Sequence, residues 1–150
     1  MANVIPFSFR GALFSGNHDF ATSGNTFKLA LYTAGSGSPY STASTVYTSG
    51  TSNQVGTSGT GYSTGGNTLT SQAVASGSAV ASVDFADTEW TSATFTAAYG
   101  GIYNSTTVDS TADRLVVVLD FGGDKTCTNG TFKITFPNPA TPGDAILSMA

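Results

Sequence analysis

The chain has 150 residues and a formal net charge of −4; 39% of its residues are hydrophobic, 11% aromatic and only 9% charged. This length suits one domain with its own core, and five scattered basic residues form no basic patch for nucleic acid. No apolar run approaches the roughly 20 residues of a membrane-spanning helix, and a single cysteine, Cys127, excludes an internal disulfide. We therefore expect one acidic domain, residues 1–150, without nucleic-acid or membrane partners.

The beginning of the chain is the first candidate for contact with another protein. Residues 1–32 are apolar with interruptions, and the candidate arm at 1–20 carries more apolar surface than a free terminus should expose. We predict an N-terminal arm with these partner-contacting residues: Ile5, Phe7, Phe9, Arg10, Leu13 and Phe14. The alternative is that this segment packs on the protein's own core as a first strand, and residues 9–14 could form a turn or two of helix.

A long polar segment follows the first clear strand signal. Residues 27–32 alternate in the manner of a half-buried strand, and residues 33–67 are rich in glycine, serine and threonine. A structureless insertion of this length is uncommon in a compact domain unless it contacts something. We predict an ordered excursion held by its larger apolar side chains: Tyr40, Val46, Tyr47, Val55 and Tyr62.

The rest of the chain is typical of strands separated by turns. We predict strands in five segments rich in apolar, β-branched and aromatic residues: 69–75, 79–85, 90–97, 115–119 and 131–136. The run at 115–119 is apolar throughout, which is typical of a strand buried on both faces. Turns are expected at 121–124 and at Asn129-Gly130, and a polar loop at 104–113.

This spacing of strands, with weak helix signals throughout, predicts an all-β fold class. We expect an antiparallel β-sandwich or a jelly-roll-like barrel with extended N- and C-terminal arms. The C-terminal arm is residues 137–150, which prolines at 137, 139 and 142 would stiffen. Residues 140–147 could form another turn or two of helix.

The motifs form no catalytic constellation. Residues 61–65 fit the G-x-S-x-G pattern with Ser63 as nucleophile, but that motif needs a strand before the serine, a helix after it and a histidine base. Here the flanks are loop-like, and the only histidine, His18, lies upstream. His18 and Asp19 form the one possible imidazole–carboxylate pair, with no nucleophile or metal partner evident. We predict that the protein is not an enzyme and has no catalytic residue.

Two groups of acidic residues raise the question of a calcium site. Their members are Asp84, Asp87 and Glu89 in one group, and Asp109, Asp113, Asp120 and Asp124 in the other. Oxygen ligands near glycines suit calcium. No EF-hand spacing is present, however, and aspartate is also a common turn residue that accepts hydrogen bonds from the nearby backbone. We expect no cofactor and no bound metal, with calcium at these residues as the alternative.

Several short segments resemble small structural proteins of tailed bacteriophages. They are Gly-Thr-Gly-Tyr at 59–62, Gly-Gly-Asn-Thr-Leu at 65–69, Phe-Ala-Asp at 85–87, Glu-Trp at 89–90, Gly-Ile-Tyr-Asn at 101–104, Leu-Asp-Phe-Gly at 119–122 and Asn-Gly-Thr-Phe at 129–132, together with the strand at 27–32. The resemblance implies a virion component without enzymatic activity. Within that class it favours a capsid cement (decoration) protein, which is made in the host cytoplasm, binds the exterior of the major capsid protein lattice, clamps neighbouring subunits and often forms a homotrimer.

The composition agrees with an adhesive structural module. Many uncharged hydroxyl groups and small residues permit close contact with another surface at little desolvation cost, while tyrosine and phenylalanine supply anchors. Two other functions stay open. The protein could belong to the phage tail, as a tube, fibre or receptor-contacting component. It could instead be a carbohydrate-binding module that stacks sugars on Trp90 and the tyrosines beside an acidic calcium site.

Overall fold

The structure is a computed structural model, and it describes the chain apart from residues 1–2, 36, 50–52, 78–79, 138–144 and 150. The elements of the described part are α1 (Phe7–Phe14), β1 (Phe27–Tyr32), β2 (Asn67–Thr68), β3 (Ala73–Gly77), β4 (Val80–Asp84), β5 (Thr88–Asn104), β6 (Arg114–Ile134) and β7 (Leu147–Met149). The expected all-β fold class is confirmed, with two antiparallel sheets. The fold is sandwich-like, and the strands do not close into the alternative barrel.

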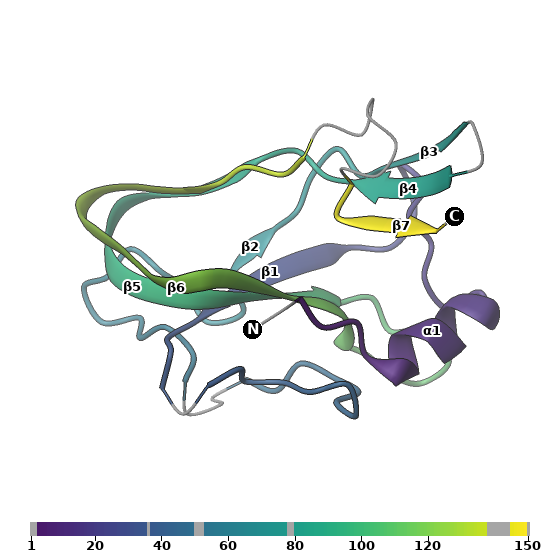
Figure 1. The fold of residues 1–150 in the computed structure, drawn as a ribbon, viewed down its shortest axis with the longest axis horizontal. Coiled ribbons are helices and arrows are strands. Elements are labelled where there is room, and N and C mark those ends of the chain that lie inside the picture. Colours follow the sequence, from purple (N-terminus) through teal and green to yellow (C-terminus); the bar gives the residue numbers. More distant parts are fainter. Residues whose placement is uncertain (1–2, 36, 50–52, 78–79, 138–144, 150) are drawn as a thin grey trace.

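The long hairpin of β5 and β6 contributes to both layers of the molecule (Figure 1). Sheet A has the strand order β2-β1-β5-β6, and sheet B has the order β3-β4-β7. In Figure 1 the hairpin leaves the region beside β1, curves back at one end of the molecule and returns toward β3 and β4. One pair of strands therefore encloses much of the space between the two layers.

Irregularities in β6 produce this curvature. Four residues of β6, 121–124, lie opposite a single residue of β5, and residues 128–129 lie opposite Thr94 alone. Such inserted residues bend a strand and increase its twist. Gly122 and Gly123 adopt φ angles of 73° and 121°, and Asn129 adopts 50°. The prediction of chain-reversing turns at 121–124 and 129–130 is therefore wrong, because both sites are bulges within one continuous strand.

Buried side chains cover both faces of sheet A. The main cluster lies on the face toward sheet B and includes Phe20, Phe27, Leu29, Leu31, Phe85, Trp90, Phe95, Ile102, Val116, Val117 and Phe132. The second cluster lies on the other face and comprises Ala30, Tyr32, Tyr40, Tyr47, Ala98, Tyr99, Tyr103, Leu115 and Val118. Residues 115–118 contribute to both clusters, which confirms that this run is buried on both faces.

The described part of the excursion at 33–67 packs against sheet A, with Tyr40 and Tyr47 in the cluster on the outer face and Val55 and Tyr62 in the main cluster. Of its five predicted anchors, Tyr40, Tyr47, Val55 and Tyr62 are all at most 8% exposed, while Val46 is half-buried. The Tyr47 ring stacks on that of Tyr103 with centroids 4.3 Å apart. Four of the five predicted anchors are therefore buried, and the packing of Tyr40 and Tyr47 explains why the central strands of sheet A carry large apolar residues on the outer face as well.

The two terminal segments pack against the body. Residues 7–14 form helix α1 rather than an extended arm or a first strand, in line with the predicted helical turns. Just before the helix, Val4 forms an isolated antiparallel bridge with Val118 of β6. At the other end, most of the predicted helix at 140–147 and of the predicted C-terminal arm lies outside the described residues, and Leu147–Met149 form strand β7, paired with β4.

Candidate functional site

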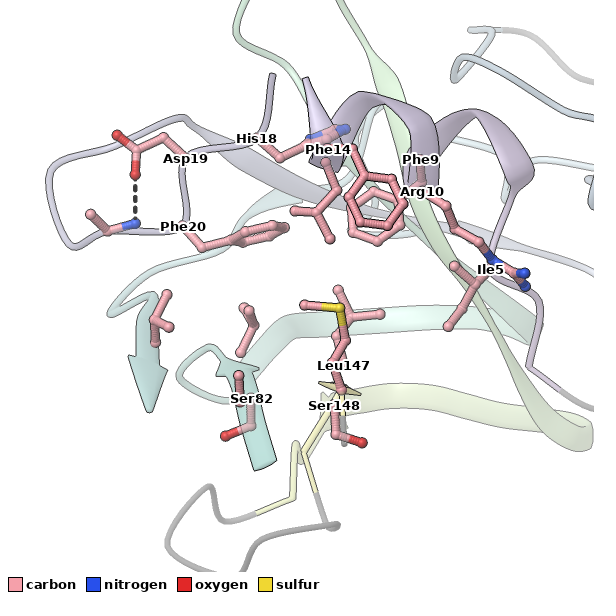
Figure 2. A pocket seen from close by; sticks show the side chains of 16 residues that line it. Ile5, Phe9, Arg10, Phe14, His18, Asp19, Phe20, Ser82, Leu147 and Ser148 are labelled. Carbon is pink, nitrogen blue, oxygen red and sulfur yellow. Dashed lines mark hydrogen bonds between the residues drawn. The ribbon is translucent and has the colours of Figure 1, made fainter. Parts of the chain in front are cut away.

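An apolar groove separates helix α1 from sheet B (Figure 2). Its volume is about 550 Å³. One wall is formed by residue 5, α1 and residues 18–21, and the other by β3, β4 and β7. Five of the six predicted partner-contacting residues line it: Ile5, Phe9, Arg10, Leu13 and Phe14. The segment singled out in the sequence therefore forms one side of an apolar groove.

Packing, rather than strong helix-forming residues, holds α1 beside the groove. The helix begins after Pro6, and the backbone N–H of Phe7 donates to the carbonyl oxygen of Thr42 in the excursion (2.9 Å). No side chain caps its N-terminus. Phe9 and Ala12 are buried on its inner face, and burial of an apolar face supplies most of the stability of such a short helix.

Large apolar side chains are exposed around the groove. Phe14 is 89% exposed, and Val74 and Met149 are each 58% exposed; all three line the groove. Phe7, the sixth predicted residue, is 62% exposed but lies outside the groove, where the guanidinium of Arg10 sits 5.3 Å from its ring centroid. Apolar residues gathered on an exposed concave surface are typical of an interaction site.

His18 belongs to the packing beneath α1 and does not form a catalytic pair with Asp19. The imidazole is 7% exposed, and its centroid lies 4.9 Å from that of Phe9. Burial, aided by the positive charge of Arg114, lowers the pKa of His18 to about 4. The carboxylate of Asp19 instead accepts a hydrogen bond from the backbone N–H of Ala21 (2.9 Å), as Figure 2 shows. This bond closes a local turn.

Ser63 has none of the surroundings of a nucleophile elbow. It is exposed in a turn that precedes β2. The described residues just before it, 53–62, contain no strand, and the element that follows is β2 rather than a helix. An elbow requires a strand before the serine and a helix after it, so the pattern at 61–65 does not mark one.

Two of the acidic residues, Asp87 and Asp120, accept hydrogen bonds from the nearby backbone. Asp87 forms an ion pair with Lys133 (2.9 Å) and accepts a hydrogen bond from the Phe136 backbone N–H (3.0 Å), and these contacts lower its pKa. The Asp120 carboxylate accepts from the Gly122 backbone N–H (2.9 Å). Within the described part of the chain, no three His, Cys, Asp or Glu residues lie close enough together to hold a metal ion.

The aromatic residues considered for sugar stacking are buried. Trp90 is 4% exposed, and every tyrosine is at most 9% exposed. Several tyrosines use their hydroxyl groups within the core: the Leu31 backbone N–H donates to Tyr62 (3.0 Å), and Tyr103 donates to the Gly65 carbonyl oxygen (2.9 Å). Stacking of a sugar needs an accessible ring face, which these residues do not present.

Reasoning from the sequence missed the side of the groove formed by sheet B. Its residues come from three separated strands and include Val74, Ala81, Val83, Leu147 and Met149. The apolar residues near position 147 are visible in the sequence, but nothing local indicates that they pair with β4 and face α1. That arrangement depends on contacts between residues far apart in the chain.

Comparison with protein families, with curated proteins and with solved structures finds no match to this chain. In the described part, the one helix has eight residues, too few to cross a membrane. Function is therefore inferred from the groove and from the resemblance carried by the short sequence segments.

Proposed function

We propose that this chain is a structural protein of a tailed bacteriophage particle, and specifically a capsid cement protein that binds the exterior of the major capsid lattice as a homotrimer. The observation that carries the proposal is the groove between α1 and sheet B, with exposed Phe14, Val74 and Met149 along it. An exposed surface of this kind gains free energy when a partner covers it, at roughly 25 cal/mol for each Å² of apolar area buried.

The proposed occupant is an extended apolar segment of the major capsid protein. The groove lining is almost entirely apolar, and its charged residues are Arg10 and Asp19. Arg10 is exposed on α1 at the rim of the groove, and we take its guanidinium as the charge that the partner meets. An apolar segment with an acidic residue at the Arg10 end would match the groove in both polarity and charge.

The alternatives have different support. A place in the tail would use the same groove with another partner, and the position of the protein in the particle distinguishes tail from head. The carbohydrate-binding alternative is disfavoured by the burial of Trp90 and the tyrosines. For an enzyme, the described residues offer no nucleophile with an activating base, since Ser63 lies in an exposed turn and His18 is buried beneath α1.

Two phenylalanines of α1 provide a matched test of the groove. Phe14 and Phe7 are both exposed on the same helix, but only Phe14 lines the groove. We expect Phe14→Ser to weaken co-sedimentation with capsids that lack this protein by about tenfold or more, as hot-spot aromatics do. Phe7→Ser should bind like the wild type. Equal binding by both variants and the wild type would refute the groove as the docking site.

Electron cryomicroscopy of the virion that encodes this chain tests the place in the particle. Density on the outside of the head, with three copies around a threefold or quasi-threefold position, is the expected result. Density confined to the tail would replace the cement assignment with the tail alternative. Absence of the protein from purified particles would contradict both.

A further inference from the structure

The edge of sheet B formed by β3 is exposed. Sheet B has the strand order β3-β4-β7, so β3 has a neighbour on one side only, and Figure 1 shows it at the margin of this sheet. Residues 73–76 are all exposed, and among the described segments β3 pairs through its backbone with β4 alone. Every second residue of such a strand directs its N–H and C=O groups outward, where a further strand can pair with them.

The other edges of the two sheets are protected against such pairing, and β3 is not. β2 has two residues and β7 has three. β6 carries Lys125 and Lys133, contains bulges, and is bridged by Val4 at Val118. Short length, lysines and bulges all keep a strand edge from joining another sheet. β3 has five residues without a charge, a proline or a shift of register, so among these edges it is the one best suited to receive a strand.

The sequence of β3 identifies a second copy of this chain as the partner. The residues Ala-Val-Ala-Ser occur at 73–76 and again at 79–82. Because the second occurrence overlaps β4, β3 already pairs within the chain with a strand of nearly the same sequence, with Ala75 opposite Ser82 and Ser76 opposite Ala81. On its free edge, β3 of another molecule would present the same small, uncharged side chains, and no like charges would meet.

We propose that β3 pairs antiparallel with β3 of a second copy around a twofold axis perpendicular to the sheet. An axis at Ala75 pairs the whole strand: 73 with 77, 74 with 76, and 75 with 75. Sheet B would then continue across both molecules, with their two grooves on the same face. Two short strands bury little area, so the contact is weak in solution and strengthens where copies are held side by side.

The strand contact is separable from docking through the groove. Val74 lines the groove, and Ala75 does not. Successive side chains of a strand point to opposite faces, so a substitution at position 75 changes the proposed contact without changing the groove wall. The pairing is measured on the isolated protein, and its outcome therefore does not depend on capsid binding.

Disulfide trapping at position 75 tests the pairing. In a Cys127→Ser background, Ala75→Cys places the thiols of two paired copies directly opposite each other, within the range of a disulfide. Thr128→Cys, at an exposed position of β6, is the control. Under oxidation by copper-phenanthroline, we expect Ala75→Cys to form a covalent dimer at least about tenfold faster than the control, because pairing raises the effective concentration of the thiols. Equal rates would refute the pairing.

Opposite charges at the same position test the twofold symmetry without a cysteine. Ala75→Lys and Ala75→Glu each place like charges opposite each other in the pair, whereas a mixture of the two variants places opposite charges there. In ¹⁵N-labelled wild type, the amide signals of β3 should shift with protein concentration; each variant alone should lose this dependence, and the equimolar mixture should restore it. A mixture that behaves like the separate variants would overturn the symmetry. Wild-type signals that ignore concentration but respond to added capsids would assign the edge to a capsid segment instead.

Discussion

Acidification from pH 7 to pH 4 should destabilise the folded protein through His18. Burial and the charge of Arg114 lower the pKa of this imidazole from 6.5 to about 4 in the folded state. Between these two values the unfolded chain binds more protons than the folded chain, so stability falls as the pH falls. Each unit of pKa difference corresponds to 1.36 kcal/mol, so the total loss is about 3 kcal/mol. It begins near pH 6.5 and is nearly complete at pH 4.

Urea unfolding at a series of pH values measures this effect, with Trp90 as the probe. Trp90 is the sole tryptophan and is 4% exposed, so unfolding should change its fluorescence. His18→Gln serves as the comparison, since glutamine has an oxygen that can accept from Asn104 and does not titrate.

The difference between wild type and His18→Gln isolates the histidine. Asp87, whose folded-state pKa is lowered, loses its contribution as the pH falls below its usual range, and Asp84, whose pKa burial raises, acts in the opposite direction. Both effects are present in both proteins and cancel in the difference. The unfolding free energy of the wild type minus that of His18→Gln should fall by about 3 kcal/mol from pH 7 to pH 4. A constant difference would refute the inferred role of His18.

Two further substitutions test the attachment of the excursion. Gly66→Ala should lower the free energy of unfolding by at least about 2 kcal/mol and lower the thermal midpoint, because Gly66 has φ of 72° and a Cβ there would overlap a backbone carbonyl of β1. Gly56→Ala is the control: Gly56 has open space around it, so this variant should leave the thermal midpoint nearly unchanged. Tyr103→Phe should cost about 1–2 kcal/mol by removing the donor to the buried Gly65 carbonyl, measured by urea unfolding. Tyr99→Phe is its control, and equal losses in the two tyrosine variants would contradict the assigned hydrogen bond.

The strands were largely predictable, and the bends within them were not. The apolar run at 115–119 and the alternation at 27–32 reflect burial on one or both faces of a strand, which is a local property of the residue pattern. Glycine and asparagine at 121–124 and 129–130 favour positive φ angles in turns and in bulges alike. Only the pairing of β6 with β5 on both sides of each site distinguishes the two structures.

The candidate site was predictable from one side only. Ile5, Phe9 and Phe14 attracted attention because apolar residues are frequent near the beginning of the chain, and they line the groove. Their helical conformation was weakly indicated, since the helix has no N-terminal side-chain cap and is held by tertiary packing. Similarly, burial of His18 was not evident, because its neighbours Phe9 and Phe27 approach only in the folded chain.

The sequence by itself determined the all-β class, the anchors of the excursion and the apolar character of the N-terminal segment. Each follows from local patterns: alternation of side chains, scattered large residues among small polar ones, and clustered phenylalanines. Only the tertiary structure decided that α1 and β7 face each other across a groove and that His18 and Arg114 line one cavity. These residues are brought together by sheet pairing and by burial, which join segments that no local pattern connects.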